Sequence, residues 1–168
     1  MTSAELTALA AIEEGKYAQA FPSFGPERRG APVMAFVRVS ETPIRTREKV
    51  YSPDIVVVLD PSLLAIVNVE AGLKEGGLVI LNSRKSIEEV RKETGIKARL
   101  ALVDASRIAM ETMRVPITNT TMLGALLKAA SLISMDALQA PIQHRFGPIA
   151  EKNLTACKRA FEETIVEE

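Results

Sequence analysis

The sequence has 168 residues, 47% of them hydrophobic, which predicts a single compact domain spanning 1–168. Lysine plus arginine equals aspartate plus glutamate at 21 each, so no overall field attracts nucleic acid or an anionic membrane. One cysteine and one histidine exclude an intrachain disulfide and any iron–sulfur or all-cysteine metal site built by this chain alone. The lone cysteine fits a reducing compartment, and no apolar run reaches the roughly 18 residues of a membrane span. We therefore expect a cytoplasmic protein that binds neither nucleic acid nor membrane.

The first third of the chain predicts a helix followed by two strands. Residues 3–14 carry apolar side chains at helical spacing, and Gly15 is placed to end the helix. Residues 17–21 and 32–39 are strand candidates, the second with clear alternation of its side chains. We expect these two strands to add an antiparallel pair at one edge of a sheet.

Residues 22–32, where the first of these strands gives way to the second, hold three prolines, two glycines and the triplet Glu27-Arg28-Arg29. Proline restricts the backbone and glycine permits unusual turns, so the pattern predicts a shaped loop rather than a loose linker. Two guanidinium groups on such a loop form a fork suited to carboxylate or phosphate. The alternative is a surface turn in which the arginines make a salt bridge with Glu27. The residues by themselves leave both interpretations open.

The remainder of the chain alternates buried strands with helices. Residues 55–59, 78–81 and 100–103 are continuous apolar runs, typical of parallel strands buried on both faces. Ser86 begins a capping box for a helix that Gly95 ends. Further helices are expected at residues 105–113, 121–132, 135–146 and 148–165, with Pro141 interrupting or kinking the third unless it falls in a first turn. The pattern predicts an α/β domain with a mostly parallel sheet.

Three polar residues stand at the carboxyl ends of the buried strands, where ligands collect in open α/β sheets: Asp60, Asn82 and Asp104. Asp60 precedes Pro61, and Asp104 precedes Ala105 and Ser106. Both arrangements are ordinary for residues that cap a helix, so capping is favoured over catalysis.

The later helices offer one further anion site. Asn119 or Thr120 is placed to cap the helix that follows, and the exposed N–H groups beyond could meet an anion. Gly124 suggests that this helix packs closely against a neighbour. His144 is interpreted as a surface or helix-end residue, and Cys157 as a small core residue.

Three segments, in the same order, resemble gamma subunits of the 2-oxoacid:ferredoxin oxidoreductase family, most nearly those of the pyruvate type. They are EEGKYAQAFPSFGPERRGAPVMAFVRVS (13–40), SPDIVVVLDPSLL (52–64) and ITNTTMLGALLKA (117–129). The resemblance implies a Rossmann-like, three-layer α/β fold. It also implies a complex that decarboxylates a 2-oxoacid on thiamine diphosphate with Mg²⁺, passes electrons through [4Fe–4S] clusters to ferredoxin, and releases acyl-coenzyme A.

On this resemblance, alpha, beta and delta subunits carry the thiamine diphosphate, Mg²⁺ and clusters, and this chain contributes coenzyme A contacts and assembly surface. The implied contact residues are Glu27, Arg28, Arg29, Asn119 and Thr120. No catalytic residue or metal ligand is expected in this chain itself. The alternatives are a purely structural assembly subunit, a gamma subunit of a 2-oxoisovalerate or 2-oxoglutarate enzyme, and a stand-alone nucleotide-binding domain.

The sequence departs from the family at its first residues. Family members open with a strand and a Gly-x-Gly-Gly-Gln-Gly-type loop directly before the helix at residues 3–14 here. The resemblance therefore implies that the first strand and its glycine-rich loop are missing from this sequence. We expect the native chain to continue upstream of Met1, with an intact mass above 18.2 kDa.

Overall fold

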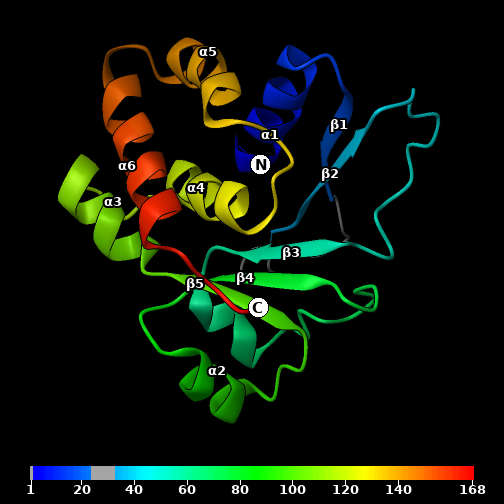
Figure 1. Cartoon of the computed structure of the whole chain (residues 1–168), viewed down its shortest axis with the longest axis vertical. Helices are drawn as coiled ribbons and strands as arrows, with labels where there is room; N and C mark the ends of the chain where they lie inside the picture. Colours follow the sequence, from blue (N-terminus) through cyan, green and yellow to red (C-terminus); the bar gives the residue numbers. More distant parts are fainter. Residues whose placement is uncertain (1, 24–32) are drawn as a thin grey trace.

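The structure, a computed structural model, describes residues 2–23 and 33–168. Its central sheet has the order β3-β4-β5-β6 (Figure 1). The strands are β3 (Ile55–Val58), β4 (Leu78–Asn82), β5 (Arg99–Val103) and β6 (Ile165–Val166). β3, β4 and β5 are parallel, and β6 pairs antiparallel with β5. The α/β class and the mostly parallel, mixed sheet expected from the sequence are confirmed.

Alternate side chains of the sheet enter two separate hydrophobic cores. In β4, Leu78 and Ile80 join the larger core, whereas Val79 and Leu81 join the smaller one. All four are at most 4% exposed, so the strand is buried on both faces. This burial explains why the strand reads as an unbroken apolar run rather than an alternating one.

Two helical layers of unequal thickness cover the sheet (Figure 1). The larger core lies under α1 (Thr2–Glu13), α3 (Ala105–Met113), α4 (Asn119–Ala129), α5 (Met135–Phe146) and α6 (Ala150–Glu163). The smaller core is covered by α2 (Ile87–Thr94) and the one-turn helix η1 (Pro61–Ala65). A second short helix, η2 (Gly147–Ile149), leads into α6. Within the described ranges, none of the helices is long and apolar enough to cross a membrane.

The two strands near the beginning of the chain form a sheet of their own in the described part of the molecule. β1 (Tyr17–Pro22) and β2 (Ala35–Ser40) pair antiparallel along their full length. We expected this pair at the edge of the main sheet; instead it lies against α1, and its inward residues Ala18 and Val39 join the larger core. The apolar face of the hairpin is thus buried by a helix rather than by continuation of the main sheet.

Gly124 allows α4 and α6 to approach very closely. A Cβ atom at this position would lie 2.0 Å from the carbonyl oxygen of Cys157 and 2.9 Å from the Cβ of Ala160. Only hydrogen fits in that space, so the close packing predicted from Gly124 is confirmed. The contact fixes the position of α4 relative to α6.

Most element boundaries lie within three residues of those predicted, and α4 spans Asn119–Ala129 rather than 121–132. Ser86 caps α2 by accepting the N–H of Glu89, and Gly95 ends it in the left-handed conformation, as predicted. The last helix ends at Glu163 rather than continuing to residue 165, because the β-branched residues from Thr164 onward extend and pair with β5. The predicted interruption at Pro141 was wrong: α5 continues through it, and the buried ring packs into the interior.

Candidate functional site

The residues implied as coenzyme A contacts fall into two groups. Glu27, Arg28 and Arg29 lie outside the described residues. Asn119 and Thr120 are the first two residues of α4. The site can therefore be built from the start of α4.

The start of α4 has no side-chain cap. The capping position is Thr118, whose side chain makes no capping hydrogen bond, and its carbonyl accepts the N–H of Met122. The prediction that Asn119 or Thr120 caps the helix was wrong, since both lie inside its first turn. The N–H groups of that turn have no partner within the helix, and the helix dipole makes them favourable for an anion.

Two side-chain contacts join this first turn to neighbouring helices. From α1, the Ser3 hydroxyl donates to the carbonyl oxygen of Asn119 at 3.0 Å. On the other side, the Thr120 hydroxyl donates to Oδ1 of Asn153 in α6 at 2.6 Å. Asn153 also donates from Nδ2 to the carbonyl oxygen of Ile149 at 2.9 Å, so both ends of its amide are used. Thr120 and Asn153 are 1% and 4% exposed, which makes this a buried polar contact.

Thr121, the next residue, differs from Thr120 in one respect. It is also fully buried, but its hydroxyl oxygen has no hydrogen-bond partner among the described residues. Thr120 and Thr121 are therefore both buried, but only the hydroxyl of Thr120 has a hydrogen-bond partner among the described residues.

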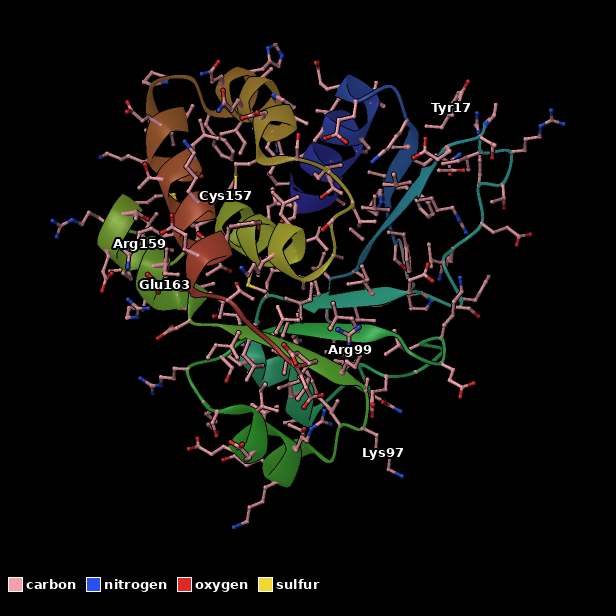
Figure 2. All side chains as sticks on the ribbon, viewed as in Figure 1. Tyr17, Lys97, Arg99, Cys157, Arg159 and Glu163 are labelled. Atoms are coloured by element: carbon pink, nitrogen blue, oxygen red, sulfur yellow. The ribbon has the colours of Figure 1, made fainter. Side chains whose placement is uncertain are left out.

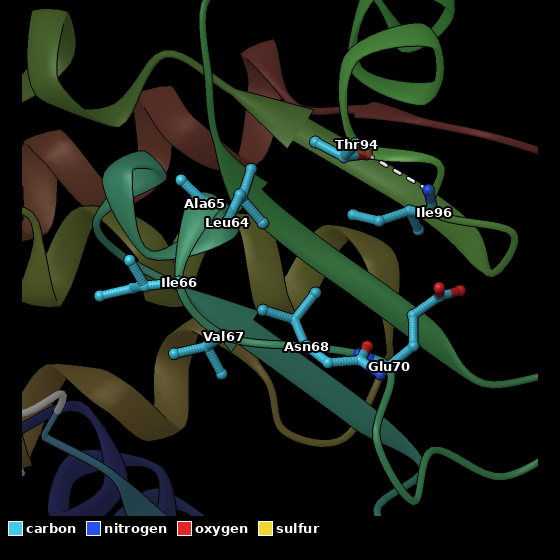
Figure 3. A pocket seen from close by; sticks show the side chains of 9 residues that line it. Leu64, Ala65, Ile66, Val67, Asn68, Glu70, Thr94 and Ile96 are labelled. Atoms are coloured by element: carbon cyan, nitrogen blue, oxygen red, sulfur yellow. Dashed lines mark hydrogen bonds between the residues drawn. The ribbon is translucent and has the colours of Figure 1, made fainter.

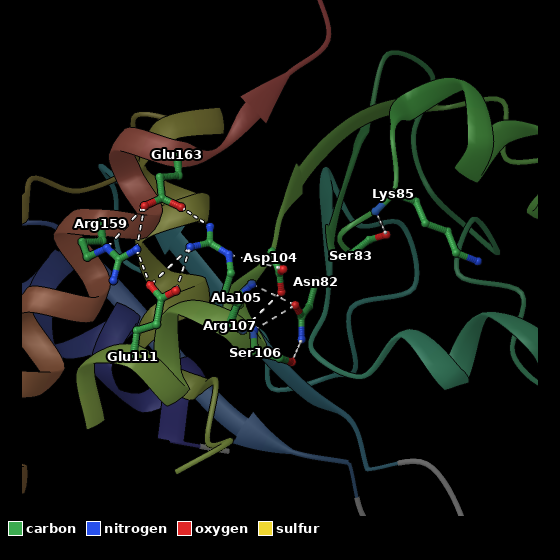
Figure 4. A network of polar contacts seen from close by, with 10 residues as sticks. All are labelled: Asn82, Ser83, Lys85, Asp104, Ala105, Ser106, Arg107, Glu111, Arg159 and Glu163. Atoms are coloured by element: carbon green, nitrogen blue, oxygen red, sulfur yellow. Dashed lines mark hydrogen bonds and ion pairs between the residues drawn. The ribbon is translucent and has the colours of Figure 1, made fainter. Parts of the chain in front are cut away.

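The polar residues at the carboxyl ends of the sheet strands stabilise turns, and Figure 4 shows two of them, Asn82 and Asp104. Asp60 accepts the N–H and hydroxyl of Ser62, and these hydrogen bonds lower the pKa of its carboxyl group. Asp104 accepts the N–H of Arg107 at the start of α3. Both capping predictions are confirmed.

Asn82 connects three strand ends through its amide. Its Nδ2 donates to the carbonyl oxygen of Leu59. Its Nδ2 also donates to the Ser106 hydroxyl, and its Oδ1 accepts the N–H groups of Ala105 and Ser106 (Figure 4). The side chain is 4% exposed and has a partner at each end. Asn82 therefore holds the ends of β3, β4 and β5 together, and its amide has no group left over for a ligand.

Comparison with known proteins decides the family of this fold. The family model for pyruvate ferredoxin/flavodoxin oxidoreductase matches residues 1–163. The pyruvate/ketoisovalerate oxidoreductases common subunit gamma of Thermococcus kodakarensis is 53% identical over 170 aligned positions, covering 100% of this chain and 92% of the relative. The pyruvate synthase subunit PorC of Methanothermobacter thermautotrophicus is 48% identical, with coverage of 97% and 88%.

A solved structure supports the same family as these sequence comparisons. The crystal structure of the pyruvate oxidoreductase subunit PORC from Thermotoga maritima superposes with a TM-score of 0.86 at 38% identity, covering 99% of this chain and 90% of that one. The chain belongs to the pyruvate ferredoxin/flavodoxin oxidoreductase family. The family resemblance inferred from the three sequence segments is thereby confirmed.

A ferredoxin oxidoreductase implies metal-containing centres, and the described residues of this chain do not fit them. Those residues contain no group of three or more His, Cys, Asp or Glu side chains arranged to hold a metal ion. A [4Fe–4S] cluster takes four cysteine thiolates, and the sequence has one cysteine. That residue, Cys157, is buried among the helices of the thick layer, and burial raises the pKa of its thiol to about 12 (Figure 2). It is therefore a core residue, as predicted.

Another polar cluster joins α3 to α6 at the surface of the molecule. Arg107 and Arg159 lie between the carboxylates of Glu111 and Glu163, with each arginine contacting both (Figures 2 and 4). Desolvation acts to raise the pKa of Glu163, but hydrogen bonds from the two arginines outweigh it and leave that pKa below its usual range. Because all four groups are paired with each other, the cluster is a structural connection between helices.

The described surface also has a groove of about 360 Å³ on the side of the sheet that carries α2 (Figure 3). It is lined by residues 64–70 with Thr94 and Ile96. Its carboxylate, Glu70, already accepts the N–H groups of Lys97 and Ala98. The groove thus presents apolar side chains and a carboxylate held by backbone, with no pair of groups suited to acid–base chemistry.

Sequence reasoning missed two residues of the candidate site. Ser3 and Asn153 were interpreted only as parts of helices, although they hold the first turn of α4. Neither has a local signal, because each contact joins residues far apart in the chain: 116 positions for Ser3 and 33 for Asn153.

Proposed function

We propose that this chain is the gamma subunit of a heteromeric pyruvate:ferredoxin oxidoreductase. The complex converts pyruvate, coenzyme A and oxidised ferredoxin to acetyl-coenzyme A, CO₂ and reduced ferredoxin. The observation that carries the proposal is the 53% identity with a gamma subunit, extending over the whole of this chain. Relatives named pyruvate synthase subunit PorC, at 48% identity, support the pyruvate assignment.

In this proposal the chemistry takes place on partner subunits. Alpha, beta and delta subunits carry thiamine diphosphate, Mg²⁺ and the [4Fe–4S] clusters, which supply 2-oxoacid decarboxylation and electron transfer to ferredoxin. The single cysteine of this chain supports that division, since it cannot hold a cluster. It also fits the reducing cytoplasm, where we place the complex.

The contribution of this chain is to bind coenzyme A and to provide assembly surface. Arg28 and Arg29 are chemically suited to phosphate, because a guanidinium donates two parallel hydrogen bonds to phosphate oxygens. The first turn of α4 offers N–H groups and a half-buried Asn119 side chain. Thr120 is 1% exposed and its hydroxyl is engaged by Asn153, so its side chain supports this turn from the interior.

Calorimetric titration of coenzyme A into the reconstituted complex tests this role. The double variant Arg28→Ala with Arg29→Ala, and separately Asn119→Ala, is expected to weaken binding about tenfold or more, the change for losing a charge-assisted hydrogen bond. Substitution of exposed Lys92 by Ala, on the opposite helical layer, serves as the control. Unchanged affinity in both site variants would favour the alternative of a purely structural assembly subunit.

A second function is favoured by the names of the relatives. The Thermococcus relative is a common subunit of pyruvate and ketoisovalerate oxidoreductases, so this chain is also a candidate to serve a 2-oxoisovalerate enzyme. Purification of the native complex through this subunit, followed by coenzyme A-dependent viologen reduction with each 2-oxoacid, separates the two cases. Activity with pyruvate alone supports a dedicated subunit; two separable complexes, one for each substrate, support a shared one.

A further inference from the structure

The first turn of α4 is fixed by neighbouring helices rather than by its own cap. A capping side chain normally accepts an N–H of the first turn and so uses up part of the anion-binding capacity of a helix start. Among the described residues no side chain does so, and the hydroxyl of Thr120 donates to Asn153 in the interior. The turn is thereby held in place by contacts that use none of its N–H groups.

The two anchors act on consecutive residues and from opposite sides. Ser3 holds the carbonyl oxygen of Asn119 from α1, and Asn153 holds the hydroxyl of Thr120 from α6. Asn153 is itself fixed, because its Nδ2 donates to the carbonyl oxygen of Ile149. Contacts with two other helices, α1 and α6, therefore hold Asn119 in position.

We propose that Asn153, acting through Thr120, is a positioning residue for coenzyme A, and that Ser3 has the same role from the side of α1. This inference rests on the proposed function, which makes the start of α4 a coenzyme A contact. A binding group must be held within a fraction of an ångström to keep its hydrogen bonds, so loss of an anchor weakens coenzyme A binding although the anchor never touches the ligand.

Adjacent Thr121 provides the matched control. Thr120→Val and Thr121→Val make the same change, from hydroxyl to methyl, in two buried side chains of the same turn. The first substitution removes the bond to Asn153, and the second removes a hydroxyl that has no partner in the described residues. A difference between these variants therefore reports the anchor and not the change in polarity.

The experiment measures steady-state kinetics of the reconstituted complex, with viologen as electron acceptor, at varied coenzyme A and saturating pyruvate. Thr120→Val and Asn153→Leu are expected to raise the KM for coenzyme A about tenfold, while kcat and the KM for pyruvate change less than about twofold. Thr120→Ser, which keeps the hydroxyl, is expected to return the KM for coenzyme A to the wild-type value. Thr121→Val is expected to leave it unchanged.

The outcomes separate this inference from the function on which it rests. If Asn119→Ala raises the KM for coenzyme A while Thr120→Val and Asn153→Leu lower only the thermal stability, the anchors are merely structural and the inference is overturned. If Asn119→Ala and the double arginine variant also have no effect, the proposed coenzyme A role fails, and the inference fails with it. Should the buried variants not assemble, Ser3→Ala decides: removal of this part-buried bond is expected to raise the KM about threefold, and no rise overturns the inference.

Discussion

The two faces of the sheet are stabilised in different ways. On the thick side, helices pack directly on one another, and the contact of α4 with α6 is close enough to require Gly124. On the thin side, loops cover the sheet together with α2 and η1. Charged side chains hold these loops in place by hydrogen bonds to their backbone groups. Arg91 donates to the carbonyl oxygens of Ile96 and Ala98 and pairs with Glu167. The arrangement of the elements is therefore set by helix packing on the thick side and by a few polar contacts on the thin side, and the proposed coenzyme A contact at the start of α4 lies on the thick side.

The largest expected effect comes from disturbing the helix contact of the thick side. Gly124→Ala places a methyl group 2.0 Å from the carbonyl oxygen of Cys157, so α4 and α6 must separate. We expect a loss of about 3 kcal/mol in the free energy of unfolding, the upper part of the usual range for overpacking, measured by urea denaturation. Gly95→Ala is the control from the thin side: space is open there, and only the left-handed backbone opposes the substitution, at a cost of about 1 kcal/mol.

The second largest effect is expected from a substitution on the thin side of the sheet. Arg91→Leu removes the donor to Ile96 and Ala98 and the partner of Glu167. Hydrogen bonds that involve a charged group contribute about 2 kcal/mol, and we expect a loss of that size because Arg91 is about two-thirds buried. Hydrogen exchange should quicken at residues 96–98 and 165–167 and remain unchanged in α4. Equal acceleration on both faces would contradict the division between them.

A smaller effect concerns the buried threonines of the thick side. Thr120→Val leaves Oδ1 of Asn153 without its donor, and we expect a loss of about 1–2 kcal/mol. Thr121→Val replaces an unbonded hydroxyl and should be neutral or stabilising by a few tenths of a kcal/mol. Thermal unfolding of the two variants side by side measures the difference; equal losses would show that the bond to Asn153 contributes nothing.

The smallest effect is the pH dependence of the α3–α6 ion cluster. Hydrogen bonds from the two arginines hold the pKa values of Glu163 and Glu111 below their ordinary range. A carboxyl group with a depressed folded pKa stabilises the protein above its unfolded pKa, and this contribution is lost as the pH falls through the folded pKa. Stability should therefore decline below about pH 4.5, and Glu163→Gln should reduce that decline. Comparison of Tm at pH 7 and pH 4, with and without 1 M salt, checks the sign.

Local signals predicted the elements well where one residue decides a boundary. The cap at Ser86, the stop at Gly95 and the capping roles of Asp60 and Asp104 were all readable, because each depends on residues within three positions. The limits of α3 and α5 also agreed with the sequence, although α5 continues through Pro141. Tertiary packing overrode the local penalty at that proline.

The candidate site was predicted less completely. Asn119 and Thr120 could be singled out from their place before an apolar helix, but not the inward turn of the Thr120 hydroxyl. That orientation depends on Asn153, an amide which no spacing rule connects to α4. Strand β6 was likewise hidden, since two residues after a helix pair only when β5 is already in place. Contacts between distant segments are decided by the fold, and a local pattern does not encode them.

The short strand β6 has a consequence for handling the protein. It pairs with Ala101 and Leu102 and so covers one hydrogen-bonding side of β5, a strand whose two faces are both apolar. Deletion of residues 165–168 would leave that side of β5 as an open, hydrophobic edge, the kind of surface on which chains add to one another. Such a truncated chain should aggregate even where its helices stay folded, so affinity tags are best joined through a polar spacer that leaves this pairing intact.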